Sequence, residues 1–201
     1  MQQKQKVTIY YGLSGTMKGS TISSLGPDVK VMESAIKPWK HYQFGLFKDL
    51  VQDNDLTYGI LHLVRLQEFL RLNKGKNLLA IERSISDCLF YNNNSEEFGD
   101  KNKLGESKIQ ELVEEEMKLL GEFDVTRILL IQKDEDFIRD VILKEPTRKK
   151  TFNGSLDLYL ELQDKYVRWT EKYNKLNKVN EIYNAKEYIE TVLGMEYLNN
   201  K

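Results

Sequence analysis

The stretch VTIYYGLSGTMKGST, residues 7–21, decides the fold class. Its first five residues are β-branched or aromatic and stop at Gly12, which is typical of a short buried strand. Glycines and hydroxyl residues follow, and a brief helix is expected to begin near Lys18 and to end near Gly26 and Pro27. Backbone N–H groups at such a strand–loop–helix junction point at one spot, where the helix dipole favours an anion. The segment therefore predicts a phosphate-binding loop.

The loop departs from the standard phosphate-loop pattern at two positions, since Met17 stands in place of a glycine and Gly19 in place of a hydroxyl residue. Lys18 is expected to be an exposed loop residue that reaches the terminal phosphates, and Ser20, displaced by one position, to supply the hydroxyl near a magnesium ion. The alternative is a glycine-rich connection that binds no ligand. The candidate phosphate-binding residues of this segment are Gly12, Ser14, Gly15, Thr16, Met17, Lys18, Gly19, Ser20 and Thr21.

The rest of the chain alternates short apolar runs with longer amphipathic ones. Further strands are expected at residues 29–32, 77–81, 127–131 and 179–183, and helices at 56–73, 109–120, 156–173 and 185–193. A polar surface loop is expected at 91–103. This alternation predicts an α/β fold with a mostly parallel five-stranded sheet and helices on both faces.

Ligands of parallel sheets collect beyond the carboxyl ends of the strands, and chemically active side chains follow two of the expected strands here. Glu33 can take a proton from an attacking hydroxyl, and Trp39 can form the wall of a base pocket. Arg83 can meet a phosphate or a developing charge, and Glu82 can hold magnesium-bound water or orient an acceptor. The alternatives are a strand-end surface carboxylate, a loop anchor and a surface ion pair.

The helix expected at 56–73 has two distinct faces. Its apolar side carries Leu56, Ile60, Leu63, Leu66 and Leu70, and the opposite side carries Tyr58, His62, Arg65 and Phe69. Rings with one guanidinium suit a flat heterocycle, so we expect this second face and the strand-end residues to line one cleft. The alternative is an ordinary solvated or partly packed face, on which His62 is satisfied by a neighbour.

A basic segment at residues 144–154 interrupts the pattern before the helix at 156–173. Arg139 and the cluster Arg148, Lys149 and Lys150 can close over a triphosphate and neutralise its charge. The alternative is a solvated basic loop.

The composition of the chain excludes several classes of protein. Thirty basic against thirty-one acidic residues give a formal charge of −1, so neither nucleic acid nor an anionic membrane is an expected partner. The single cysteine, Cys88, excludes an internal disulfide, and no apolar run approaches the roughly 20 residues that span a bilayer. We expect one cytoplasmic domain over residues 1–201, with a lid at roughly 144–154.

The order of these motifs resembles the thymidylate kinase and deoxynucleoside kinase group of P-loop kinases over nearly the whole chain. Glu33 with Trp39, and Glu82-Arg83-Ser84, look like the deoxynucleoside kinase branch, whose Glu activates the sugar hydroxyl and whose Arg assists at the phosphates. Arg65-Leu-Gln67 looks like thymidylate kinases, whose helix Arg contacts the pyrimidine. The resemblance implies a three-layer P-loop kinase fold, ATP with Mg²⁺, and a homodimer.

The expected activity is transfer of the ATP γ-phosphate to a pyrimidine deoxynucleoside monophosphate. Two alternatives are kept: a deoxynucleoside kinase that uses Glu33 as the base, and a non-catalytic nucleotide-binding protein, which Gly19 favours. The expected catalytic residues are Lys18, Glu33, Arg83 and Arg148. Arg139 joins the ATP-binding set, and Ser20 and Glu82 are the candidate metal residues. The acceptor-binding set is Glu33, Trp39, Tyr58, His62, Arg65, Phe69, Glu82 and Arg83.

Overall fold

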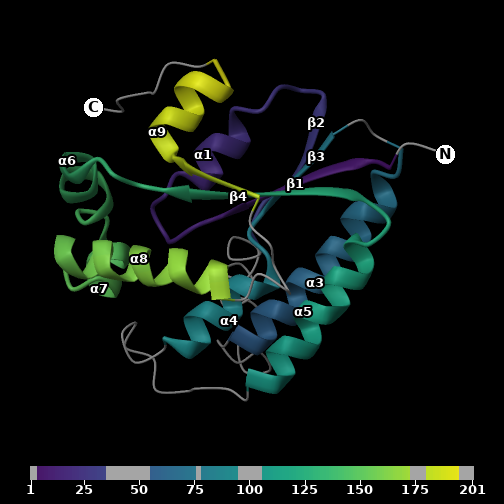
Figure 1. The fold of residues 1–201 in the computed structure, drawn as a ribbon, viewed down its shortest axis with the longest axis horizontal. Coiled ribbons are helices and arrows are strands. Elements are labelled where there is room, and N and C mark those ends of the chain that lie inside the picture. Colours follow the sequence, from purple (N-terminus) through teal and green to yellow (C-terminus); the bar gives the residue numbers. More distant parts are fainter. Residues whose placement is uncertain (1–3, 35–54, 76–77, 95–105, 173–179, 195–201) are drawn as a thin grey trace, which may run out of the picture. The chain divides into compact units, whose positions relative to one another are not determined.

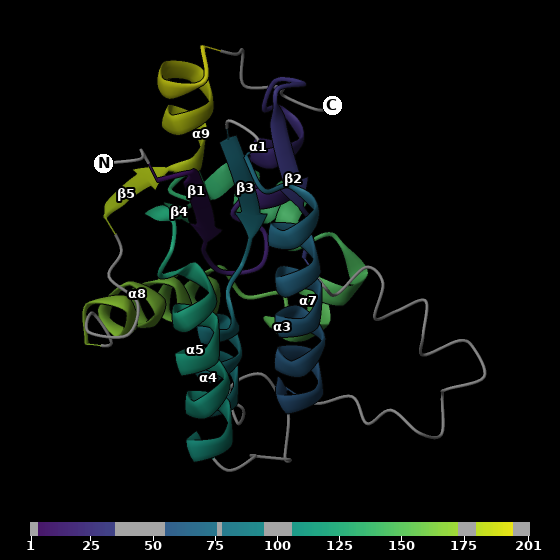
Figure 2. The ribbon, with the colours of Figure 1, turned by 90° about the vertical axis from the view of Figure 1, so that its right-hand side faces the viewer.

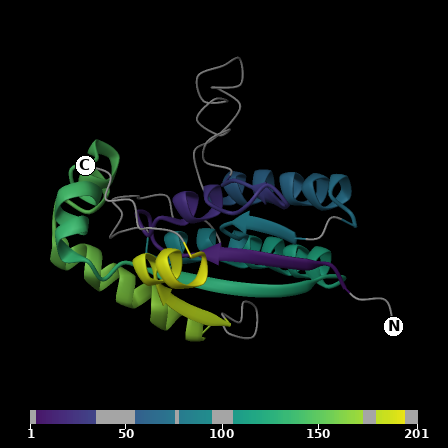
Figure 3. The same ribbon diagram turned by 90° about the horizontal axis from the view of Figure 1, so that it is seen from above.

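The computed structural model describes residues 4–34, 55–75, 78–94, 106–172 and 180–194. Five parallel strands lie side by side in the order β2-β3-β1-β4-β5. Their bounds are β1 Lys6–Tyr11, β2 Val29–Met32, β3 Leu78–Glu82, β4 Asp124–Ile131 and β5 Glu181–Asn184. Figure 3 shows β5 alongside β4, where Ile128 pairs with Glu181. The predicted α/β fold and its parallel sheet are confirmed.

The chain divides into two compact units that interleave in the sequence. One unit comprises residues 1–9 with 28–126, and the other comprises residues 10–27 with 127–201. The boundary falls inside β1, after Ile9, and inside β4, after Thr126. The expectation of a single domain over residues 1–201 stays a prediction.

Three helices of the first unit pack together: α3 Asp55–Leu72, α4 Ile85–Asn93 and α5 Glu106–Leu120 (Figures 1 and 2). The approach is close at Gly59 of α3. A Cβ atom there would lie 3.0 Å from Leu112 Cδ1 and 3.4 Å from Ile85 Cγ2. A small residue at position 59 therefore lets α3 contact both neighbouring helices.

The buried face of α3 differs from the predicted one. Leu66 and Leu70 are buried as expected, but Ile60 is 47% exposed and His62 is fully buried. Because α3 packs against both α4 and α5, its inward stripe runs through positions 59, 62, 66 and 70 rather than through Ile60. The prediction that His62 lies on the side opposite the leucines is therefore wrong.

Helix α4 is an element that the apolar periodicity does not indicate, and its capping residues explain why it forms. Ser84 is the N-cap, and Asp87 completes a capping box by accepting from the Ser84 N–H at 3.0 Å. The first residues of the loop expected at 91–103 belong to α4, and residues 95–103 lie outside the described part of the chain.

The second unit carries the short helices and α8. Its elements are α1 Lys18–Ser23, α6 Glu135–Phe137, the π-helical turn Ile138–Ile142, α7 Pro146–Thr151, α8 Leu156–Lys172, α9 Ala185–Glu187 and the π-helical turn Tyr188–Val192. Helices α8 and α9 lie on opposite sides of β4 (Figures 1 and 2). The rings of Phe152 and Tyr159, 5.0 Å apart, join α7 to α8 in the core. Among the described residues, no helix is both long and apolar enough to cross a membrane.

Candidate functional site

The loop after β1 makes its closest backbone approach at Gly12. This residue has φ 138°, and a Cβ atom would lie 2.3 Å from the Leu130 carbonyl oxygen and 2.5 Å from Thr16 Oγ1. Gly15 is similarly restricted: its φ is 96°, and a Cβ atom at this position would lie 2.8 Å from Ile142 Cγ2. Only glycine fits either position without a shift of its neighbours. The two glycines therefore fix the path of this loop beside β4.

Met17 occupies the left-handed region, with φ 58° and ψ 20°. The standard phosphate-loop pattern has glycine at this position, and this conformation is the physical reason for that preference. The chain keeps the backbone geometry with a methionine, at a cost of about 1–2 kcal/mol. Met17 therefore adopts a backbone conformation that glycine would adopt without this cost.

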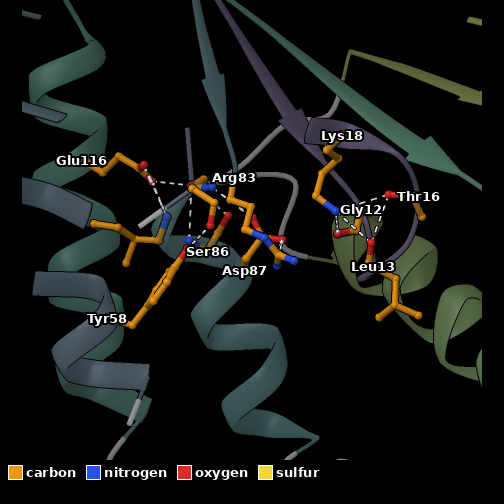
Figure 4. A network of polar contacts seen from close by, with 12 residues as sticks. Gly12, Leu13, Thr16, Lys18, Tyr58, Arg83, Ser86, Asp87 and Glu116 are labelled. Atoms are coloured by element: carbon orange, nitrogen blue, oxygen red, sulfur yellow. Dashed lines mark hydrogen bonds and ion pairs between the residues drawn. The ribbon is translucent and has the colours of Figure 1, made fainter. Parts of the chain in front are cut away.

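Lys18 is buried, with only 4% of its surface exposed. Its Nζ donates to Gly12 O at 2.7 Å, to Leu13 O at 2.8 Å and to Thr16 Oγ1 at 3.3 Å (Figure 4). The prediction of an exposed lysine is wrong, because the loop curls round the ammonium group and satisfies it with oxygens. A phosphate oxygen at Lys18 would have to replace at least one of these acceptors.

Two hydroxyl groups follow Lys18, and their environments differ. Ser20 is exposed on α1. Thr21 is fully buried, and its Oγ1 has no hydrogen-bond partner within the described part of the chain. An unpaired buried hydroxyl is costly, which makes Thr21 a second candidate for the metal or phosphate contact. The assignment of Ser20 to magnesium stays a prediction.

In the first unit, Ser34 links the ends of β2 and β3 to α3. The Ser34 N–H donates to Glu82 Oε2 at 3.1 Å, and the Ser34 hydroxyl is 2.8 Å from the Tyr58 hydroxyl. Burial raises the pKa of the Tyr58 hydroxyl, so this group is neutral. Glu33 is exposed beside this link, and Trp39 lies outside the described residues.

Arg83 has an unusual backbone and a buried head group. Its φ is 72°, and the residue is only 7% exposed. The guanidinium Nη1 is 3.8 Å from Asp87 Oδ1, and Cζ lies 5.6 Å from the centre of the Tyr91 ring. Burial alone would lower the pKa of Arg83, but Tyr91 and Asp87 raise it well above its ordinary value, so the group stays charged. The guanidinium of Arg83, which precedes α4, thus lies close to Asp87 and Tyr91 of that helix.

A buried carboxylate outside the predicted site residues meets the start of α4. Glu116 of α5, which Figure 4 labels, accepts from the Ser84 hydroxyl and from the Ile85 N–H at 3.2 Å. It also accepts from His62 Nε2 at 3.1 Å. Glu116 is 3% exposed. The sequence signal for it is its place at positions 109, 113, 116 and 120, the apolar stripe of α5. This carboxylate satisfies the N-terminus of α4, as an anionic ligand would elsewhere.

The predicted acceptor face of α3 divides into two environments. Arg65 and Phe69 are half-buried, whereas His62 is enclosed by α5. Arg65 Nη1 is buried and has no hydrogen-bond partner among the described residues. Arg65 therefore retains a donor for a ligand, and the acceptor role of His62 loses its geometric basis. The shared cleft of the helix face and strand-end residues stays a prediction.

The basic segment after β4 is partly helical. Glu145 caps α7 by accepting from the backbone of Thr147 and Arg148, and these bonds lower the pKa of its carboxyl. Arg148 is half-buried and Lys149 and Lys150 are exposed in the last turn of α7. Arg139 is exposed, 3.8 Å from Glu135. Arg148, Lys149 and Lys150 thus lie on the short helix α7, and Arg139 lies in the π-helical turn that precedes it.

Comparison with known proteins identifies the fold. A thymidylate kinase from Candida albicans superposes with a TM-score of 0.52 at 11% identity, over 92% of this chain and 87% of the other. The fold resembles that of P-loop kinases. The NadR protein, solved in complex with NR, gives a TM-score of 0.52 at 12% identity, and this chain spans 45% of its length. No family model and no curated protein sequence matches the chain. The likeness to P-loop kinases is therefore one of fold.

Proposed function

We propose that this protein is an ATP-dependent phosphotransferase of the nucleotide kinase type. The observation that carries the proposal is the loop of residues 12–18. In this loop Gly12 lies close to the Leu130 carbonyl of β4, and loop oxygens accept hydrogen bonds from the ammonium of Lys18. This geometry occurs directly after β1 of a fold that resembles P-loop kinases. It supports phosphate binding by residues 12–21.

Lys18 would neutralise charge that develops on the transferred phosphoryl group, and the backbone N–H groups of the loop would hold the phosphates. A magnesium ion bound with ATP would neutralise part of the negative charge of the phosphates. The hydroxyl of Thr21 or Ser20 suits such an ion, since Mg²⁺ prefers oxygen ligands and keeps several waters. Glu82 is a second candidate, although one of its oxygens accepts from Ser34.

The acceptor we propose is a pyrimidine deoxynucleoside monophosphate. The unsatisfied Nη1 of Arg65 supports a hydrogen bond to a base, and the guanidinium groups of Arg83 and Arg148 suit contacts to its phosphate. A homodimer in the cytoplasm belongs to the same proposal.

A deoxynucleoside is the alternative acceptor, favoured by the exposed carboxylate of Glu33 at the end of β2. A neutral sugar hydroxyl needs a base, whereas the phosphate of a monophosphate is already ionised. Glu33→Gln should therefore lower kcat by about 10²–10⁴ if the acceptor is a nucleoside and much less if it is a monophosphate.

A non-catalytic nucleotide-binding protein is the other candidate. Gly19 removes the usual hydroxyl, and Lys18 is already satisfied by loop oxygens. One experiment separates the three functions: Mg²⁺-dependent turnover of ATP with a panel of nucleosides and nucleoside monophosphates, in the wild type and in Glu33→Gln. Phosphorylation of a pyrimidine monophosphate supports the proposal. ATP binding without transfer to any acceptor would overturn it in favour of the non-catalytic function.

A further inference from the structure

The hydrogen bonds around Ser84 at the start of α4 form a buried network. The residue just before Ser84, Arg83, has a strained backbone conformation, which core packing does not require. The left-handed backbone of Arg83 costs about 1–2 kcal/mol relative to an ordinary conformation. Such strain persists only where the surroundings determine the conformation strongly, and it tends to occur at functional sites.

The neighbouring residue Ser84 is the centre of this network. Its hydroxyl donates to Glu116, its N–H donates to Asp87 at 3.0 Å, and Oγ accepts from the Ser86 N–H at 3.2 Å and the Ser86 hydroxyl at 3.1 Å. Asp87 in turn faces the guanidinium of Arg83. The backbone on the C-terminal side of Arg83 is thus held from α4 and from α5.

Glu116 and His62 connect this centre to the helices around it. His62 Nε2 is 3.1 Å from Glu116, so α3 contributes to holding the same carboxylate. The groups facing that carboxylate from Ser84, Ile85 and His62 are all donors in these contacts. An amide at position 116 could accept only through its oxygen, and its NH₂ would face a donor. The network therefore specifies a carboxylate.

We propose that Glu116, held by His62, is a positioning residue that acts through Ser84 to keep Arg83 in the conformation needed for phosphoryl transfer. The inference rests on the proposed function, because it assigns Arg83 a role at the transferred phosphate. A displacement of about 1 Å in a catalytic constellation can cost about 10²-fold in rate.

The test is a double-mutant cycle on kcat, with Glu116→Gln, Arg83→Ala and the double variant. Glu116→Gln should lower kcat by about 10- to 100-fold in the wild type and by less than about twofold in Arg83→Ala. A merely structural role would reduce kcat by the same factor in both backgrounds, and that result would overturn the proposal. Glu111→Gln, on the exposed side of the same helix, is the matched control and should stay within about twofold.

Position 62 gives an independent variant. Glutamine can place an N–H donor near the position of histidine Nε2, so His62→Gln should retain most of the rate that His62→Ala loses. Equal losses in the two variants would count against the role of the His62 contact. If Glu116→Gln does not fold, Ser84→Ala replaces it in the cycle, since it removes the hydroxyl bond to Glu116 together with the two bonds from Ser86 to the same oxygen.

A measurement without activity separates this proposal from the proposed function. The Nε–H of Arg83 is buried and should exchange slowly with solvent in NMR spectra of the full chain, with assignment by its loss in Arg83→Lys. Glu116→Gln should accelerate this exchange at least tenfold, and Glu111→Gln should not. Unchanged exchange in Glu116→Gln would overturn the positioning role. Absence of any phosphoryl transfer in the wild type, with accelerated exchange in Glu116→Gln, would overturn only the kinase assignment.

Discussion

Lys18→Ala should destabilise the nucleotide-free protein as well as abolish its activity. The ammonium donates to two backbone carbonyls at 2.7 and 2.8 Å and to the Thr16 hydroxyl at 3.3 Å. Hydrogen bonds that involve a charged group contribute about 1.5–3 kcal/mol, and these three share one ammonium whose burial carries a desolvation cost. We therefore expect a loss of about 1.5–3 kcal/mol in the free energy of unfolding for the whole set.

The assay is urea unfolding without nucleotide, compared at equal m-values, with thermal unfolding as a check. For a chain of this size the loss corresponds to a fall in Tm of about 3–12 °C. Lys133→Ala, an exposed lysine of the same unit, is the matched control and should change the free energy of unfolding by less than about 0.5 kcal/mol.

Addition of ATP with Mg²⁺ at about 100 times its Kd should stabilise the wild type by about 2.7 kcal/mol and leave Lys18→Ala almost unchanged. A Lys18→Ala protein as stable as the wild type would refute the reasoning, because the loop oxygens would then gain nothing from the ammonium.

Two further substitutions test the loop and the acceptor site. Gly12→Ala should lower the free energy of unfolding by about 2–6 kcal/mol, since backbone strain and overpacking each cost about 1–3 kcal/mol. Gly26→Ala is the control: a Cβ atom at Gly26 meets open space, so this variant should be nearly neutral in the same urea titration. Equal stability of the two would contradict the close passage of the loop beside Leu130 O. In steady-state kinetics, Arg65→Ala should raise the acceptor KM by about 10- to 150-fold with little change in kcat. An unchanged KM would show that Arg65 does not bind the acceptor.

The sheet is well predicted from the sequence because the strands have a strong local signal. The runs at residues 7–11, 29–32 and 127–131 are mostly β-branched, apolar or aromatic, with one basic residue in each of the last two, and a glycine or a polar residue follows each run. Periodicity also locates α3, α5 and α8 to within a few residues. These elements depend mainly on patterns within one segment of chain.

The site is less predictable because its geometry depends on contacts between segments. The inward side of α3 is misassigned at His62 by periodicity alone, since a carboxylate 54 positions away makes burial of the imidazole favourable. Glu116 is not predicted from the sequence for the same reason. A charged residue in an apolar stripe indicates a site only when the groups that donate hydrogen bonds to it are known. Lys18 is buried because the backbone of the loop brings the Gly12 and Leu13 carbonyls to its ammonium group. The glycine pattern indicates a tight loop at this place, but it does not define the backbone path.

The central claim is that the loop of residues 12–18 presents ATP for phosphoryl transfer. The most direct measurement is the transfer of ³²P from [γ-³²P]ATP to pyrimidine deoxynucleoside monophosphates, with Mg²⁺ or with EDTA, by the wild type, Lys18→Ala and Lys133→Ala. The account predicts labelled diphosphate product that requires Mg²⁺, is unaffected in Lys133→Ala and falls by about 10²-fold or more in Lys18→Ala. Transfer by Lys18→Ala at the wild-type rate would contradict it.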